Sequence, residues 1–418
     1  RAGVNAGNSI ASGGNYNVAV GDEAGTAITT GDQNVAIGYG AATALTTGAN
    51  IVAIGYLAGD ALTTGENNVA IGKNALGAED THDFNIAIGS NALAVQNAGA
   101  DAYNVAIGHN AGTSVSTGIQ NVIIGGLAGD SLTDADFNIA IGYTALGLDT
   151  LGSRSIAIGH TALGAQNFTT ATNAYNVGVG HNAGGAITTG VQNTLIGGLA
   201  GDVLSDADFN VAIGYAALST DTLGSSSVAI GREALFTQNF TTATSAYNVA
   251  VGFQAGKLVT TGINNTLIGA FAGDKITTGD RNVALGQGSF TESTTGDNNT
   301  AIGTDALANN TTASSNTAVG KSALNANTSG AGNVAFGAEA LSVNVLGSNS
   351  TAIGREALRQ QNPATATDAH NTAVGYRAGL LVTTGVENTL IGALAGDALT
   401  SSNENTAVGK SALSADTL

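Results

Sequence analysis

Five histidines are the side chains of this sequence best suited to bind a metal or to transfer protons near neutral pH. His109, His160 and His181 each follow a glycine that closes a short apolar phrase, and the other two are His82 and His370. We interpret the shared position of His109 and His181 as the product of a duplicated block of the sequence. Because the sequence has no His-Glu-x-x-His motif and no cysteine, it predicts no metal site and no cofactor.

Two segments resemble the end of a phosphate-binding loop. Residues 320–322 and 409–411 read Gly-Lys-Ser, but Ser315 and Glu404 stand where the leading glycine of that motif belongs. The Gly-x-Ser-x-Gly elbow of serine hydrolases does not occur either. The sequence therefore predicts a protein that is not an enzyme. A hydrolase acting on surface glycans, with convergent carboxylates in a groove, is a minor alternative.

A set of aspartates recurs at one position of the sequence, after Leu-Ala-Gly or Phe-Ala-Gly. A calcium site needs several oxygen ligands within one short loop, and these segments offer fewer. We therefore expect each aspartate to cap its turn by bonding its own backbone. The set comprises Asp60, Asp130, Asp202, Asp274 and Asp397.

Threonines share another register, and a flat array of threonines would suggest ice binding. Other residues interrupt this array, at Asp80, Asn97, Ser116, Asn167 and Val345 among others, so an ice-binding solenoid is only a minor alternative. The register includes Thr29, Thr46, Thr63, Thr188, Thr260, Thr277, Thr294, Thr311 and Thr383.

Aromatic residues near the longest turns are the candidates for receptor contact. They are Tyr103, Phe168, Tyr175, Phe240 and Tyr247. Aromatic side chains on protruding loops can anchor a glycan or a protein partner. The alternative is that they pack over the widened turns and keep them closed.

The element that must position all these residues is a repeat. The phrase Asn-Val-Ala-Ile-Gly and its variants recur throughout the sequence, and most intervals between closing glycines equal the one from Gly55 to Gly72. The exceptions are slightly longer, and no linker interrupts residues 1–418, which we predict to be one continuous array. The closing glycines, which we expect to be structural turn residues, include Gly38, Gly55, Gly72, Gly89, Gly125 and Gly142.

Each interval is predicted to form one coil of a parallel β-solenoid, which gives about 23 coils in all. The phrase is short and β-branched, which favours a strand, and pairs of helices need about 33 to 47 residues. The extra residues of the three longest intervals fall just before the next phrase, at 166–176, 238–248 and 361–371, where a turn can absorb them. A second set of turn glycines is expected to have positive φ: Gly31, Gly48, Gly65, Gly190, Gly262, Gly279, Gly296 and Gly385.

The interior of such a coil is thin. Fixing the backbone of one coil costs about 17–34 kcal/mol of entropy, and one buried Val and one buried Ile return about 3–6 kcal/mol, so a coil must stack to fold. Val69 and Ile71 share one face of a strand and Ala70 lies on the other, and the sequence does not decide which face is inside. We expect the recurrent Asn before each strand to form a hydrogen-bonded ladder.

Composition excludes several partners. The net charge is −18 and only 10% of residues are charged, which argues against nucleic acid and against anionic membrane surfaces. No apolar run approaches the roughly 20 residues of a membrane span. The sequence begins and ends in mid-pattern, so we expect it to be a piece of a longer protein.

The repeats resemble those of two related groups of fibres. Ser-Ser-Val-Ala-Ile-Gly at 226–231 resembles the head repeats of YadA-like trimeric autotransporter adhesins. The segment at 294–307, TTGDNNTAIGTDAL, is similar to repeats of phage tail fibres. The resemblance implies a left-handed parallel β-roll, a homotrimer and an extracellular role in attachment, at a cell surface or on a virion. This resemblance is compatible with two roles. The chain is either a rigid spacer or a module that binds a receptor or glycan through its long turns.

Overall fold

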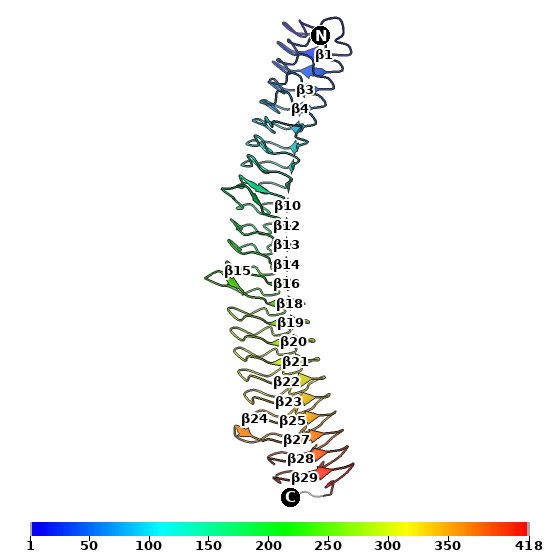
Figure 1. Ribbon diagram of the computed structural model, residues 1–418, viewed down its shortest axis with the longest axis vertical. Helices are drawn as coiled ribbons and strands as arrows, with labels where there is room; N and C mark the ends of the chain where they lie inside the picture. The colour runs from blue at the N-terminus through cyan, green and yellow to red at the C-terminus, as the bar shows by residue number, and fades with distance from the viewer. Residues whose placement is uncertain (1, 416–418) are drawn as a thin grey trace. The chain divides into compact units, whose positions relative to one another are not determined.

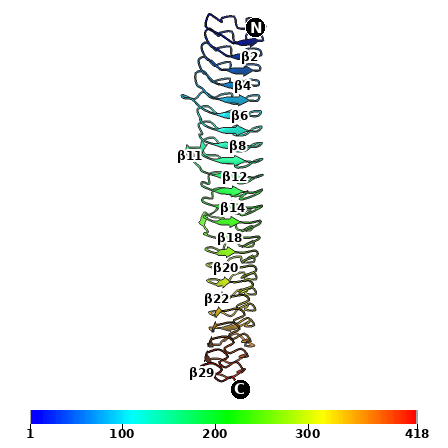
Figure 2. The ribbon, with the colours of Figure 1, turned by 90° about the vertical axis from the view of Figure 1, so that its right-hand side faces the viewer.

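The structure is a computed structural model that describes residues 2–415, and it consists of strands and turns without a helix. The chain divides into two compact units, Arg1–Phe209 (unit 1) and Asn210–Leu418 (unit 2). Within each unit, successive coils stack as a parallel β-solenoid, as Figures 1 and 2 show. The solenoid predicted from the glycine spacing is therefore confirmed, with one coil for each interval.

In the described part of unit 1, eleven three-residue strands form one long parallel sheet, and two shorter strands, β9 and β11, pair beside it. On every pair of neighbouring coils the strands are in register; Ala70 of β4, for example, lies opposite Ala87 of β5. The strands are β1 (Val18–Val20), β2 (Val35–Ile37), β3 (Val52–Ile54), β4 (Val69–Ile71), β5 (Ile86–Ile88), β6 (Val105–Ile107), β7 (Val122–Ile124), β8 (Ile139–Ile141), β9 (Gly152–Ser153), β10 (Ile156–Ile158), β11 (Thr172–Asn173), β12 (Val177–Val179) and β13 (Thr194–Ile196).

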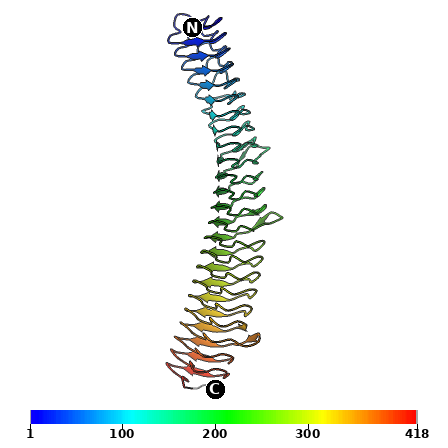
Figure 3. The same cartoon turned by 180° about the vertical axis from the view of Figure 1, so that it is seen from behind.

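The described part of unit 2 has the same arrangement, with twelve three-residue strands in a long parallel sheet and two short pairs, β15–β17 and β24–β26. Figures 1 and 3 show β15 and β24 on the side of the coils away from the long sheet. The strands are β14 (Val211–Ile213), β15 (Gly224–Ser225), β16 (Val228–Ile230), β17 (Thr244–Ser245), β18 (Val249–Val251), β19 (Thr266–Ile268), β20 (Val283–Leu285), β21 (Thr300–Ile302), β22 (Thr317–Val319), β23 (Val334–Phe336), β24 (Gly347–Ser348), β25 (Thr351–Ile353), β26 (Thr367–Asp368), β27 (Thr372–Val374), β28 (Thr389–Ile391) and β29 (Thr406–Val408).

The short strand pairs account for the three longest intervals between closing glycines. Gly152 and Ser153 of β9 pair with Thr172 and Asn173 of β11, so the added residues form a small arm and the long sheet keeps its register. The sequence prediction that insertions fall at a single turn is confirmed by this arrangement.

The closing glycines sit where successive backbones approach most closely. Gly125 has a φ of 133°, and a Cβ added there would lie 2.5 Å from the carbonyl oxygen of Gly142. Both the backbone angle and the space therefore require glycine.

The second set of turn glycines does not have positive φ, so that prediction was wrong. At Gly279, the constraint is again space: a Cβ would lie 2.5 Å from the carbonyl oxygen of Gly296 in the next coil. The left-handed turn residue comes two positions later in the repeat and carries a side chain, as at Asn67, whose φ is 57°.

The alanine face of the strands lines the interior. Ala70 is fully buried, whereas Val69 and Ile71 are partly exposed. The opposite wall supplies the larger apolar groups, such as Leu62, which packs into the space left by Gly59. In most coils the mid-strand residue is alanine, and in four coils it is a larger buried residue, Ile123, Leu195, Leu267 or Leu390.

The predicted asparagine ladder is confirmed. Asn121 is buried; its backbone N–H donates to Asn104 Oδ1 at 2.8 Å, and its own Oδ1 accepts from the backbone N–H of Asn138 at 2.9 Å. Its Nδ2 donates to the carbonyl oxygen of Ala135 at 2.8 Å. Each asparagine thus joins three coils and leaves few buried polar groups unpaired.

Candidate functional site

One candidate surface in each unit is the outward side of the long sheet, which we call the strand face. It consists of the first and third residues of each three-residue strand. In unit 1 nearly all of them are Val or Ile, and several are at least one-third exposed, including Val18, Ile107, Ile158 and Ile196. Side chains one coil apart form continuous apolar columns, and contiguous apolar surface of this kind usually marks an interaction site.

In unit 2 the same face is partly polar. Threonine occupies the first position of seven of its described strands, while the third position remains apolar, as in Leu285 and Phe336, which are 43% and 55% exposed. Unit 2 therefore has an apolar column at one position of each described strand.

Two of the five candidate receptor contacts do not face solvent. Phe168 and Phe240 are only 5% and 6% exposed. Asp149 Oδ1 accepts hydrogen bonds from the backbone N–H groups of Gly152 and Phe168, both at 3.1 Å, and its Oδ2 accepts one from Gln166 Nε2 at 2.6 Å. Phe168 thus closes the widened turn, and Phe240 has the equivalent bond to Asp221. Neither phenylalanine has much surface with which to contact a receptor.

The three tyrosines of the set are exposed. Tyr103, Tyr175 and Tyr247 are 50%, 51% and 59% exposed, and each has a positive φ near 50° at the residue before the ladder asparagine. They therefore belong to a turn column that every coil has, and the long turns are not what exposes them.

Rings and cations stack within this turn column. Tyr103 stacks on Phe84 with 4.9 Å between ring centroids. The guanidinium of Arg154 lies 4.7 Å from the ring centroid of Phe137 and 6.0 Å from that of Tyr175. Such stacks fix the orientation of exposed rings, which suits them to contact a partner.

Two of the three histidines that follow closing glycines, His160 and His181, form part of a second ring stack. His160 lies between Tyr143 and His181, with centroid distances of 5.5 and 5.3 Å. This stack follows from the coil spacing and was not foreseen in the sequence analysis. It could have been found by aligning the residue after each closing glycine.

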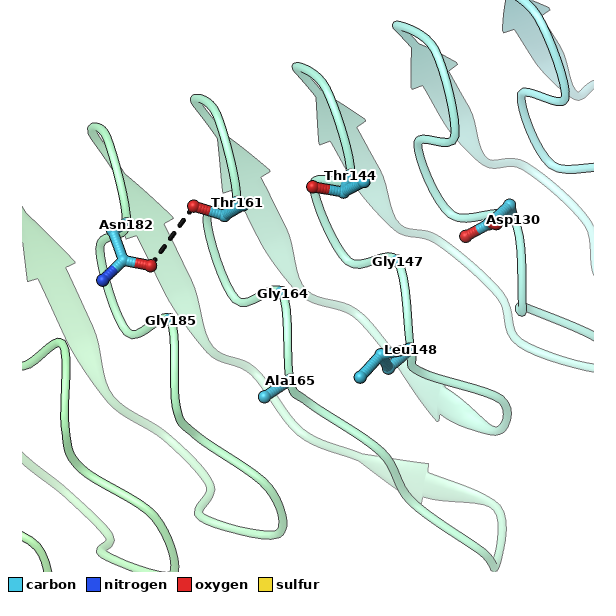
Figure 4. A pocket seen from close by; sticks show the side chains of 9 residues that line it. All are labelled: Asp130, Thr144, Gly147, Leu148, Thr161, Gly164, Ala165, Asn182 and Gly185. Atoms are coloured by element: carbon cyan, nitrogen blue, oxygen red, sulfur yellow. Dashed lines mark hydrogen bonds between the residues drawn. The ribbon is translucent and has the colours of Figure 1, made fainter.

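A groove of about 400 Å³ runs across consecutive coils of unit 1 (Figure 4). Thr144, Thr161 and Asn182 form one row of its lining, and Thr161 Oγ1 donates to Asn182 Oδ1 at 3.2 Å. Gly147, Gly164 and Gly185 form the adjacent row, with Leu148, Ala165 and Asp130 nearby.

The duplicated block shows what keeps the groove open. In the later copy of the block, larger residues replace the three glycines: Ser219 stands for Gly147, Phe236 for Gly164 and Lys257 for Gly185. The buried leucines are kept, since Leu218 corresponds to Leu146 and Leu235 to Leu163. None of the three glycines has a positive φ. Their effect is therefore to leave space on the outside of an otherwise repeated core.

At the corresponding place in unit 2, charged side chains replace the groove. Lys257 Nζ lies 2.8 Å from Glu233 Oε2, and Gln254 Nε2 donates to the same oxygen at 2.8 Å. Hydrogen bonds from Lys257 and Gln254 lower the pKa of Glu233 to about 2. The two copies of the block therefore present different outer surfaces on the same interior.

A second groove, of about 450 Å³, lies in unit 2 and is lined by three carboxylates, Asp274, Glu292 and Asp305. Burial raises the pKa of Asp274 to about 6. Lys275 Nζ lies 2.6 Å and 2.7 Å from the two oxygens of Glu292. The groove thus contains one carboxyl group that titrates near neutral pH beside an ion pair.

The recurrent aspartates lie at their coil turns as the sequence suggested. Burial raises the pKa of Asp60 and Asp130, and a hydrogen bond from the residue's own backbone partly offsets this rise. In Asp274 and Asp397 of the same set, Oδ1 is buried without a hydrogen-bond partner, so the turn cap stays a prediction. Among residues 2–415, the only group of three or more close metal-ligand side chains is a different one, Glu79, Asp80 and His82.

The threonine row is bonded to the backbone. Thr29 Oγ1 donates to the carbonyl oxygen of Thr46 at 3.1 Å, and Thr277 Oγ1 to that of Thr294 at 3.0 Å. These hydroxyl groups reinforce the contact between coils, so each has already used its proton within the protein.

No protein-family model matches the sequence, and no curated protein does. In the described residues, no helix is long and apolar enough to cross a membrane.

Proposed function

We propose that this chain is a non-enzymatic structural segment of a surface-attachment fibre, and that it assembles as a homotrimer through the strand face. The observation that carries the proposal is the column of partly exposed Val and Ile residues on the outside of the strands in unit 1. The resemblance of the repeats to adhesin heads and tail fibres supports the attachment role, its extracellular location and the number of chains.

The strand face is large enough to drive association. Covering a side chain that is about one-third exposed stabilises a complex by about 0.5 kcal/mol. In unit 1 nearly every strand contributes two partly exposed apolar residues, so this unit contributes at most roughly 10 kcal/mol. The cost of association is comparable, about 4–15 kcal/mol. A homotrimer places three copies of one apolar face around an axis, where each covers the others.

Cysteine cross-linking tests this proposal cleanly, because the chain has no cysteine of its own. Ile107→Cys places a thiol on the strand face, and Val95→Cys places one at a 48%-exposed site away from it. We expect a short bifunctional thiol reagent to join two chains of the Ile107→Cys variant and to leave Val95→Cys chains separate. Equal cross-linking of both variants would contradict assembly through the strand face.

A second candidate is receptor or glycan recognition by the exposed tyrosines. The specific observation is that Arg154 and neighbouring rings hold Tyr175 in a fixed column. Tyr103→Ala and Tyr175→Ala should abolish adhesion to target cells if this column is the contact. Undiminished adhesion by both variants would leave only the spacer role.

The hydrolase alternative has weaker support. The groove in unit 2 offers Asp274 as an acid and leaves Asp305 as the base, because Lys275 already pairs with Glu292. Release of reducing sugar from surface glycans, lost in Asp274→Asn, would revive it.

A further inference from the structure

The turn between β4 and β5 contains three potential metal ligands close together in the sequence. Glu79, Asp80 and His82 each offer a donor atom, and these atoms all lie within 4.8 Å of one another. The side chain of Glu79 is fully buried, while that of His82 is 20% exposed. The cluster therefore lies at the edge of the coil interior, with one buried anion and a route to solvent.

Glu79 occupies an interior position where most other coils have an apolar or amide side chain. Ser293, Asn310 and Asn327 at this position also have a buried oxygen without a hydrogen-bond partner, but none of them is charged. One coil earlier, the residue at this position is Leu62. Two other coils have an acidic residue at this position, Asp149 and Asp221. Both oxygens of Asp149 accept hydrogen bonds, including one of 2.6 Å from Gln166 Nε2.

Glu79 is bonded through only one oxygen. Its Oε1 accepts from the backbone N–H groups of Asp80 and His82, at 3.1 and 3.2 Å, and lies 3.0 Å from His82 Nδ1. Its Oε2 is buried and has no hydrogen-bond partner. An unpaired buried carboxylate oxygen costs several kcal/mol, so the site favours a cation.

We propose that Glu79, Asp80 and His82 bind a divalent transition-metal ion, for which Zn²⁺ is the best match. One imidazole and two carboxylates are ligands that Zn²⁺ accepts, with water in the fourth position. Ca²⁺ needs six to eight oxygens and Mg²⁺ six octahedral ones, more than this turn supplies. Binding of the ion would replace the present contact between His82 Nδ1 and Glu79 Oε1.

A bound ion would fasten this turn to the rest of the coil stack. The carbonyl oxygen of Asp80 accepts from the Thr63 backbone N–H at 2.7 Å, and that of His82 accepts from Asn68 Nδ2 at 2.8 Å. Fixing the turn therefore also fixes its contacts with the previous coil. The ion would add stability that grows with the ratio of its free concentration to its dissociation constant.

The test is Zn²⁺ titration of the full chain by calorimetry, with a chromophoric chelator as competitor. We expect one ion per chain, and more than about tenfold weaker binding in Glu79→Gln and His82→Ala. The matched control is His109→Ala, which removes an exposed histidine outside the cluster and should bind as the parent does.

Circular dichroism of the metal-free variants shows whether each still folds, so a loss of binding can be read as a loss of ligands. X-ray absorption should report one histidine nitrogen and oxygen ligands on the bound zinc. No uptake by the parent chain, or uptake unchanged in Glu79→Gln and His82→Ala, would overturn the proposal and leave a His82–Glu79 ion pair. Displacement of Zn²⁺ by equimolar Ca²⁺ would overturn the choice of metal.

Discussion

Single residues in this protein have roles that depend on their place in the coil more than on their type. Gly125 and Gly126 are adjacent, yet only Gly125 has a positive φ and faces the backbone of the next coil. A Cβ at Gly126 would meet the ring of Tyr143 at an ordinary 3.6 Å. Spacing alone identified the closing glycines, but it could not separate glycines required by φ from those required by space.

This difference predicts opposite outcomes for two neighbouring substitutions. Gly125→Ala should destabilise unit 1 by about 3 kcal/mol or more, because it strains φ and forces two coils apart. Gly126→Ala should change stability by less than about 0.5 kcal/mol. Urea unfolding followed by circular dichroism measures both, and equal effects would contradict the close approach of the coils.

Asp274 should make stability depend on pH. Burial raises its pKa from 3.8 to about 6, so the folded state holds the proton more tightly than the unfolded state does. Its contribution to stability is thus fully present below about pH 4 and is lost as the pH rises through about 6. Asp274→Asn should therefore stabilise unit 2 by about 1–3 kcal/mol at pH 7.5 and by much less at pH 3.5. A gain of the same size at both pH values would show that the carboxyl group is not perturbed.

At the scale of the element, the coil combines a thin apolar interior with a polar ladder. The sequence predicted strands, turns, insertion sites and the asparagine ladder, because all four follow from the repeat period. The sequence left open which face of each strand lies inside, because in Val-Ala-Ile either the alanine or the Val and Ile side chains could face the interior. The answer depends on the opposite wall, where residues such as Leu62 leave room for Ala70 alone.

The ladder predicts a local and specific weakness. Asn282→Ala should cost about 2–4 kcal/mol, because it leaves the Gly296 carbonyl and the Asn299 N–H without their partners. Asn298→Ala, one residue from the ladder and outside it, should cost much less. Hydrogen exchange at Asn299 measures the effect directly, and unchanged protection there would contradict the role of the ladder.

The candidate sites were predicted less well than the fold. The exposed tyrosines were named from the sequence, but the burial of Phe168 and Phe240 depends on contacts with Asp149 and Asp221 in the preceding coil. The groove and the cluster around Glu79 have no sequence motif. The groove arises from side chains that stacking brings together. Glu79, Asp80 and His82 are neighbours in the sequence, and only the burial of Glu79 depends on the stacked coils.

At the scale of the whole molecule, the central claim is that three chains cover one another's strand faces. Sedimentation equilibrium of the unmodified chain tests this most directly, because it gives mass independently of shape. The account predicts three times the chain mass of 40.7 kDa, constant over a hundredfold range of concentration. A single chain mass at all concentrations would contradict it.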